Sequence, residues 1–166
     1  HTPWDEELNL DAEPARLGAM ARTLDRFKRL PDEDRRRELD AILSALGVTD
    51  QRCCKNLMLS GDDVHARSGL GWHVGAHTVN HPILARTDDS LARAEIANGK
   101  EMLEGIIRGP VRLFAYPNGK PQRDYLPQHP EMVKRLGFDA AVSTARGAAG
   151  TGSDGYQLPR FTPWDR

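Results

Sequence analysis

The chain has 166 residues, of which 39% are hydrophobic and 28% are charged, and its formal net charge at pH 7 is −1. This length suits one domain with a hydrophobic core of its own. Because neither sign of charge dominates, the composition argues against nucleic acid as a partner, and the apolar runs are too short for a membrane span.

The first half of the chain is predicted to be almost wholly helical. Apolar residues recur at spacings of three and four over residues 14–30 and again over residues 32–46. Residues 49–54 form a candidate short third helix, and Ser60 with Asp63 has the spacing of a capping box that begins a fourth. We therefore interpret Asp62 and Asp63 as acids that stabilise the start of a helix. A metal-binding role for either is the second interpretation.

The second half alternates short apolar runs with helical patterns, as α/β folds do. The expected elements are a strand over 72–76, a helix over 87–108, a strand over 111–116, a helix over 130–136, and strands over 140–143 and 157–161. Pro159 limits the last strand to the edge or end of a sheet. Strand ends in such folds are where binding sites form.

The two cysteines, Cys53 and Cys54, are adjacent in the sequence. Neighbouring cysteines do not readily bridge to each other, so a disulfide framework is excluded. Free thiols favour a reducing compartment such as the cytoplasm, with the cell envelope as the alternative.

His77 and His81 lie four residues apart, directly after the strand predicted over 72–76. If the segment between them forms a turn or the first turn of a helix, the two imidazoles share a face and can converge on one metal ion. Zinc is the natural candidate for imidazole ligands. The alternative is a pair of structural histidines that cap or pack and bind no metal.

Four segments that follow one another carry a family resemblance: VGAHTVNHP at 74–82, LFAYPNG at 113–119, GFDAAVS at 137–143 and QLPRF at 157–161. In this combination the chain resembles the polysaccharide deacetylase family, carbohydrate esterase family four. The resemblance covers about residues 56–166. The helical lead-in of residues 1–55 looks like the insert between early strands in a subgroup of that family, and we expect one structural domain overall.

This resemblance implies a partial distorted (β/α) barrel preceded by a helical segment. It also implies a hydrolase that acts on carbon–nitrogen bonds other than peptide bonds. Such an enzyme would remove N- or O-acetyl groups from a polysaccharide or amino sugar. It would use a divalent metal, for which Zn²⁺ is the first candidate. His77 and His81 would be metal ligands, and Thr78 would orient its neighbours by hydrogen bonding. The backbone N–H of Asn118 would stabilise the oxyanion of the tetrahedral intermediate.

Three further residues are candidate contacts of an acetylated glycan. Tyr116 ends the strand over 111–116 and Pro117 begins the turn after it, and a tyrosine ring offers an apolar face to sugars. Arg160 could bind a substrate oxygen but cannot readily give up a proton, and a surface salt bridge explains it equally well.

The chain departs from the family pattern at the first motif, T-F-D-D, which supplies an aspartate ligand and an aspartate base. No segment of the sequence matches it. Ala115 and Arg160 stand where an arginine and a histidine are common. The remaining sheet would expose unpaired edges, so we expect an incomplete fragment whose N-terminal strands are missing, or pairing with a second chain. The isolated chain should bind metal weakly and catalyse poorly.

A second reading is a non-catalytic carbohydrate-binding or interaction module on a deacetylase-like scaffold. Trp72 and Trp164 could then serve as platforms for sugar rings beside Tyr116. Binding of glycans without hydrolysis would favour this module.

Overall fold

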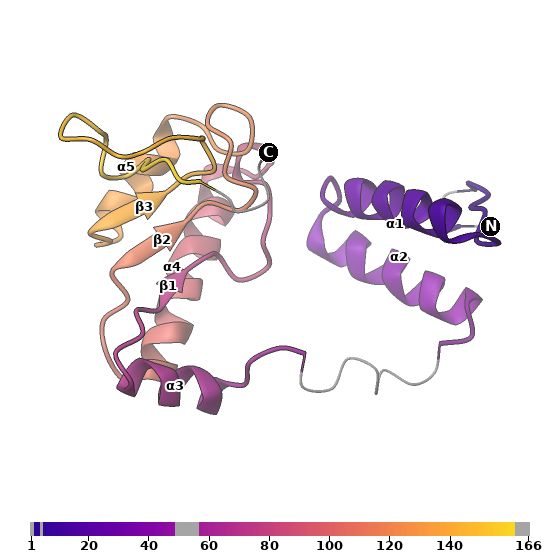
Figure 1. Cartoon of the computed structure of the whole chain (residues 1–166), viewed down its shortest axis with the longest axis horizontal. Coiled ribbons are helices and arrows are strands. Elements are labelled where there is room, and N and C mark those ends of the chain that lie inside the picture. Colours follow the sequence, from indigo (N-terminus) through magenta and orange to yellow (C-terminus); the bar gives the residue numbers. More distant parts are fainter. Residues whose placement is uncertain (1, 4, 49–56, 162–166) are drawn as a thin grey trace. The chain divides into compact units, whose positions relative to one another are not determined.

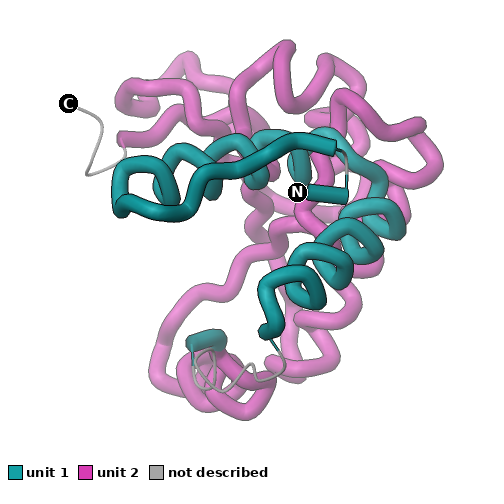
Figure 2. Tube along the Cα trace, turned by 90° about the vertical axis from the view of Figure 1, so that its right-hand side faces the viewer, with its two compact units in different colours: residues 1–58 teal, residues 59–166 magenta. Residues whose placement is uncertain are grey.

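The structure is a computed structural model, and it describes residues 2–3, 5–48 and 57–161. The chain separates into two compact units, residues 1–58 and residues 59–166, coloured separately in Figure 2. All of the residues proposed above for the metal site lie in the second unit.

The first unit contains the two predicted long helices, α1 (Glu13–Phe27) and α2 (Asp32–Ala45), joined by a short turn (Figure 1). Between them the Arg26 guanidinium donates to both oxygens of Glu38, at 2.8 and 2.6 Å. Two parallel N–H···O bonds of this kind fix the geometry of a pair as well as strengthen it. The predicted short helix over residues 49–54 and the proposed platform Trp164 lie outside the described residues.

The second unit contains a parallel three-stranded sheet, open among the described residues, in the order β1 (Gly75–Ala76), β2 (Leu113–Ala115) and β3 (Ala140–Val142). Ala76 lies opposite Phe114, which in turn lies opposite Ala141. Parallel strands end at the same edge of a sheet, so the segments after β1, β2 and β3 meet there. Residues 77–81, 116–119 and 143–145 are those segments.

Two of the helices in this unit begin at side-chain caps. The capping box predicted for α3 (Gly61–Gly69) is confirmed, since Ser60 and Asp63 each accept the other's backbone N–H. Asp88 accepts the Leu91 N–H at the start of α4 (Asp89–Ile107), close to the predicted start. Among the described residues, no helix is both long and apolar enough to cross a membrane.

The core lies between the sheet and its helices, with α4 packed on β1 and α5 (Gln128–Arg135) packed on β3 (Figure 1). Its buried residues come from every one of these elements and from the turns between them. They are Ala76, Leu84, Ala92, Ile96, Val111, Phe114, Tyr116, Tyr125, Val133, Phe138 and Ala141. Because this core is closely packed, a residue that directly follows one of its strands has little freedom to move.

Two strand predictions are wrong in extent. The first strand covers only Gly75 and Ala76, and Trp72 before it is exposed. In place of a strand over residues 157–161, Leu158 makes a single bridge to Val142, with N–H···O bonds to and from the neighbouring backbone. The next N–H on this side, that of Arg160, donates to the Ala145 carbonyl instead, so the pairing ends after one bridge.

We expect His129, in α5, to make stability depend on pH. It is fully buried, its Nδ1 accepts the Leu126 N–H at 2.8 Å, and its Nε2 has no partner among the described residues. Burial lowers the pKa of His129 below its ordinary value. The unfolded chain therefore takes up a proton below about pH 6.5 while the folded chain resists it, and the free energy of unfolding falls as the pH falls.

Urea denaturation at pH 7.5, 6.5 and 5.5 would measure this dependence, beside His129→Gln, whose side-chain oxygen can still accept from Leu126. The wild type should lose stability more steeply than the variant, by at most about 1.4 kcal/mol per pH unit. Parallel curves for the two proteins would contradict the assignment to His129.

Candidate functional site

His77 and His81 follow β1 directly and lie together at the sheet edge. Their ring centroids are 4.7 Å apart with an interplanar angle of 73°, and both side chains are exposed. The segment between them is a turn, not a helix: Thr78 and His81 have φ angles of 63° and 56°, in the left-handed region. The two imidazoles therefore meet through a tight turn, one of the two local structures considered for the pair.

The orientation of the His77 ring is fixed by β2. Its Nδ1 lies 2.7 Å from the carbonyl oxygen of Ala115, the last residue of that strand. A carbonyl can only accept, so Nδ1 carries the proton and Nε2 presents its lone pair. This is the arrangement in which a histidine acts as a metal ligand while a backbone carbonyl holds its other nitrogen.

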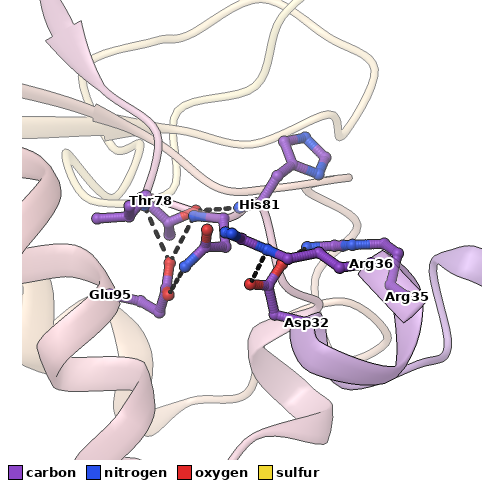
Figure 3. A network of polar contacts seen from close by, with 8 residues as sticks. Asp32, Arg35, Arg36, Thr78, His81 and Glu95 are labelled. Carbon is purple, nitrogen blue, oxygen red and sulfur yellow. Dashed lines mark hydrogen bonds and ion pairs between the residues drawn. The ribbon is translucent and has the colours of Figure 1, made fainter. Parts of the chain in front are cut away.

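The segment between the two histidines is held by Glu95, on α4. One carboxylate oxygen accepts the backbone N–H groups of Val79 at 3.0 Å and Asn80 at 2.8 Å, and the other accepts the Asn80 side-chain amide at 2.7 Å (Figure 3). Glu95 is only 8% exposed. Sequence reasoning missed this residue.

Thr78, predicted to orient its neighbours, accepts the backbone N–H of His81 through its hydroxyl at 3.1 Å. The bond closes the turn that carries both rings. The Thr78 peptide also lies against α4: a Cβ added to Gly99 would stand 3.0 Å from both the carbonyl carbon and the oxygen of Thr78. Glycine leaves room for this close approach of helix and turn, whereas a Cβ would require the Thr78 backbone to give way.

The turn after β2 contains the predicted oxyanion donor. Asn118 has a φ of 57°, and its carbonyl oxygen accepts the Thr144 hydroxyl at 2.8 Å. The Gly119 N–H donates to the Pro117 carbonyl oxygen at 2.6 Å, and the Thr144 N–H donates to the Gly119 carbonyl oxygen at 2.8 Å. Among the described residues the Asn118 N–H has no acceptor, so this donor is available to a ligand.

Tyr116 and Pro117, the proposed substrate contacts, are buried in the structure. Tyr116 is 1% exposed, its hydroxyl donates to the Tyr156 carbonyl at 2.9 Å, and its ring stacks on Tyr125 at 3.9 Å. Burial raises the pKa of Tyr116 far above its ordinary value, so the hydroxyl stays protonated. Both residues support the turn from within the core, and direct contact with a substrate stays a prediction.

Arg160 lies just beyond the Val142–Leu158 bridge, with its side chain exposed. Its backbone N–H donates to the Ala145 carbonyl at 2.9 Å, which anchors the segment after β3. The predicted contact of its guanidinium with a substrate oxygen remains a prediction.

The donor set fits part of a zinc site. Two imidazoles converge, one with its tautomer fixed, and zinc accepts such ligands with water or a carboxylate completing the shell. Within residues 2–3, 5–48 and 57–161 no group of three or more histidine, cysteine, aspartate or glutamate side chains could hold a metal ion. Asp63 is engaged in the capping box of α3, as the sequence indicated, and Glu95 is engaged by three N–H donors.

Solved structures of three bacterial proteins share this fold. A deacetylase from Streptococcus pyogenes, PplD, solved in complex with acetate, is 23% identical with a TM-score of 0.57, and the match covers 71% of this chain and 47% of that one. IcaB from Ammonifex degensii is 24% identical with a TM-score of 0.55, covering 64% and 49%. A polysaccharide deacetylase from Bacillus cereus is 24% identical with a TM-score of 0.52, covering 61% and 31%. The chain thus spans less than half the length of these proteins.

These likenesses confirm the predicted fold class, an α/β fold with a partial, unclosed sheet of the deacetylase type. No curated protein sequence matches the chain. A family model described as polysaccharide deacetylase matches residues 56–141, which contain both histidines, Glu95 and Asn118. The chain therefore belongs to the polysaccharide deacetylase family.

Proposed function

We propose that this protein takes part in the metal-dependent removal of acetyl groups from an N- or O-acetylated polysaccharide or amino sugar, with Zn²⁺ as the first candidate metal. The observation that carries the proposal is the pair His77 and His81, exposed and in contact at a sheet end, with Nδ1 of His77 held by the Ala115 carbonyl. Family membership supplies the reaction class.

A bound divalent ion would supply Lewis-acid polarisation of the acetyl carbonyl and lower the pKa of a water molecule. His77, through Nε2, and His81 would hold it. The Asn118 N–H would donate to the oxyanion that forms on the acetyl group, because no acceptor for it is found in the described part of the chain. Arg160 would contact a substrate oxygen. Acetate, present in the complex of the Streptococcus pyogenes deacetylase, is the product that this reaction would release.

The reaction needs two further groups, a carboxylate ligand and a general base. Among the described residues, no third histidine, cysteine, aspartate or glutamate forms a metal-binding group with the two histidines. We propose that the carboxylate ligand and the base come from a segment outside the described residues or from a second chain. This chain on its own should then bind zinc with reduced affinity and turn over slowly.

Acetate release from N-acetylated chito-oligosaccharides and from an O-acetylated xylan would test the proposal, with zinc present, after chelation, and after zinc is restored. Release that needs zinc would support it. Glycan binding without release, even at high protein concentration and after long incubation, would favour the non-catalytic carbohydrate-binding module. If the chain neither binds these glycans nor releases acetate from them, it has the family fold but lacks the proposed activity.

A further inference from the structure

We infer that Glu95 is a positioning residue for the histidine pair: its carboxylate fixes residues 78–80 and so sets the contact between the two imidazoles. This inference rests on the proposed metal site, because its consequence is metal affinity. Glu95 lies on α4, 14 residues after His81 in the sequence. Its effect on the site is therefore tertiary and not part of the local motif.

The first argument is the number and direction of the bonds. Three N–H donors, from the Val79 backbone and from the backbone and side chain of Asn80, point at one carboxylate. A carboxylate has two oxygens and no donor, so it can accept all three. A glutamine at this position has one oxygen, and its NH₂ group would face one of the donors. The arrangement thus selects a side chain that accepts at both of its terminal atoms, and not merely a side chain of this length.

The second argument is the backbone that Glu95 holds. Thr78 and His81, at the two ends of the held segment, both have positive φ angles, which cost energy for residues with a Cβ and most for a β-branched threonine. Such conformations persist only when the surroundings impose them. The bonds from Val79 and Asn80 to Glu95 lie between these two residues, so they are placed to impose both.

Glu95 itself is not a candidate ligand or base. It is 8% exposed, and both of its oxygens already accept hydrogen bonds from the turn. Releasing them to bind a metal or a proton would undo the contacts that place His77 and His81. It acts through the histidines, and we expect its loss to change the relative positions of their two rings.

The test is Glu95→Gln in the full chain, with Glu104→Gln as the matched control. Glu104 lies on the same helix and also accepts a backbone N–H, that of Val111 at 3.0 Å. Zinc affinity is measured by calorimetry, and the contact between the rings is measured without metal by nuclear Overhauser effects between the His77 and His81 ring protons. We expect Glu95→Gln to weaken zinc binding at least tenfold and to lose the ring contact, and Glu104→Gln to stay within twofold of wild type with the contact intact.

Wild-type affinity and an intact ring contact in Glu95→Gln would overturn the inference, and so would equal losses in the two variants, which would indicate a general effect of damaging α4. If the wild type binds no zinc, the proposed metal site fails, and the ring contact in metal-free protein still decides the role of Glu95. If Glu95→Gln does not fold, Asn80→Ala decides, because it removes one of the three bonds and keeps the carboxylate: a smaller loss of affinity supports the inference, and no loss overturns it.

Discussion

Replacing His77 by alanine is expected to abolish zinc binding while leaving the fold intact. The substitution removes one of two converging imidazoles, and it removes the one whose Nε2 is presented by a fixed tautomer. We expect the affinity for zinc to fall by at least a hundredfold, since a single histidine does not make a site. The exposed side chain gives up only one hydrogen bond, so the free energy of unfolding should fall by about 1 kcal/mol. Calorimetry and urea denaturation measure the two quantities.

His65→Ala is the matched control for this experiment. His65, on α3, is also exposed, and its Nδ1 also lies near a backbone carbonyl, that of Ile106, at 3.0 Å. Within the described residues, no second histidine ring is in contact with it. The control should lose similar stability and no zinc affinity. Equal zinc binding by wild type and His77→Ala would refute the histidine pair as the metal site and leave the structural interpretation of both residues.

The features that the sequence predicted well are those set by local interactions. The capping box at Ser60 and Asp63 and the start of α4 near Asp88 depend on bonds that span three residues, so the pattern contains all the necessary information. The strands were predicted less well. β1 has two residues, and its length depends on pairing with β2, whose residues lie far along the chain.

The contact between the two histidines was predicted from their spacing, but the geometry of the turn between them was not. The spacing of His77 and His81 indicated convergence, and the rings do lie in contact. The left-handed backbone at both ends of the turn was not predictable from the segment itself, because a β-branched threonine disfavours it and the bonds to Glu95 come from another element. Tyr116, considered as a platform for sugars, is in the core, where its ring stacks on that of Tyr125.

A signal for Glu95 was nevertheless present in the sequence. Ala92, Glu95, Ile96 and Gly99 are the buried residues of α4, and their spacings of three and four mark one helix face. An acid and a glycine on an otherwise apolar face are both unusual, since a buried carboxylate needs donors and a helical glycine costs stability. Together they indicate a polar segment of backbone packed closely on that face.

Gly99→Ala is therefore expected to destabilise the protein, although alanine is the better helix former. The added methyl would lie 3.0 Å from the carbonyl carbon and oxygen of Thr78, and these are backbone atoms that cannot rotate away as a side chain can. Either α4 or the turn must shift. We expect the free energy of unfolding to fall by about 1–3 kcal/mol, as for other overpacked sites, and zinc affinity to fall at least tenfold as His77 and His81 move apart.

Gly105→Ala, on the same helix, isolates the contact from the helix propensity. A Cβ at Gly105 meets nothing within 4 Å, so alanine there should stabilise the protein by about 0.5–1 kcal/mol and leave zinc binding unchanged. The two substitutions are chemically identical and should differ in sign because only one of the glycines faces the turn between the histidines. If both stabilise equally, the Thr78 backbone does not lie against Gly99, and the positions of the two imidazoles must be set by the hydrogen bonds of Glu95, the Ala115 carbonyl and the Thr78 hydroxyl.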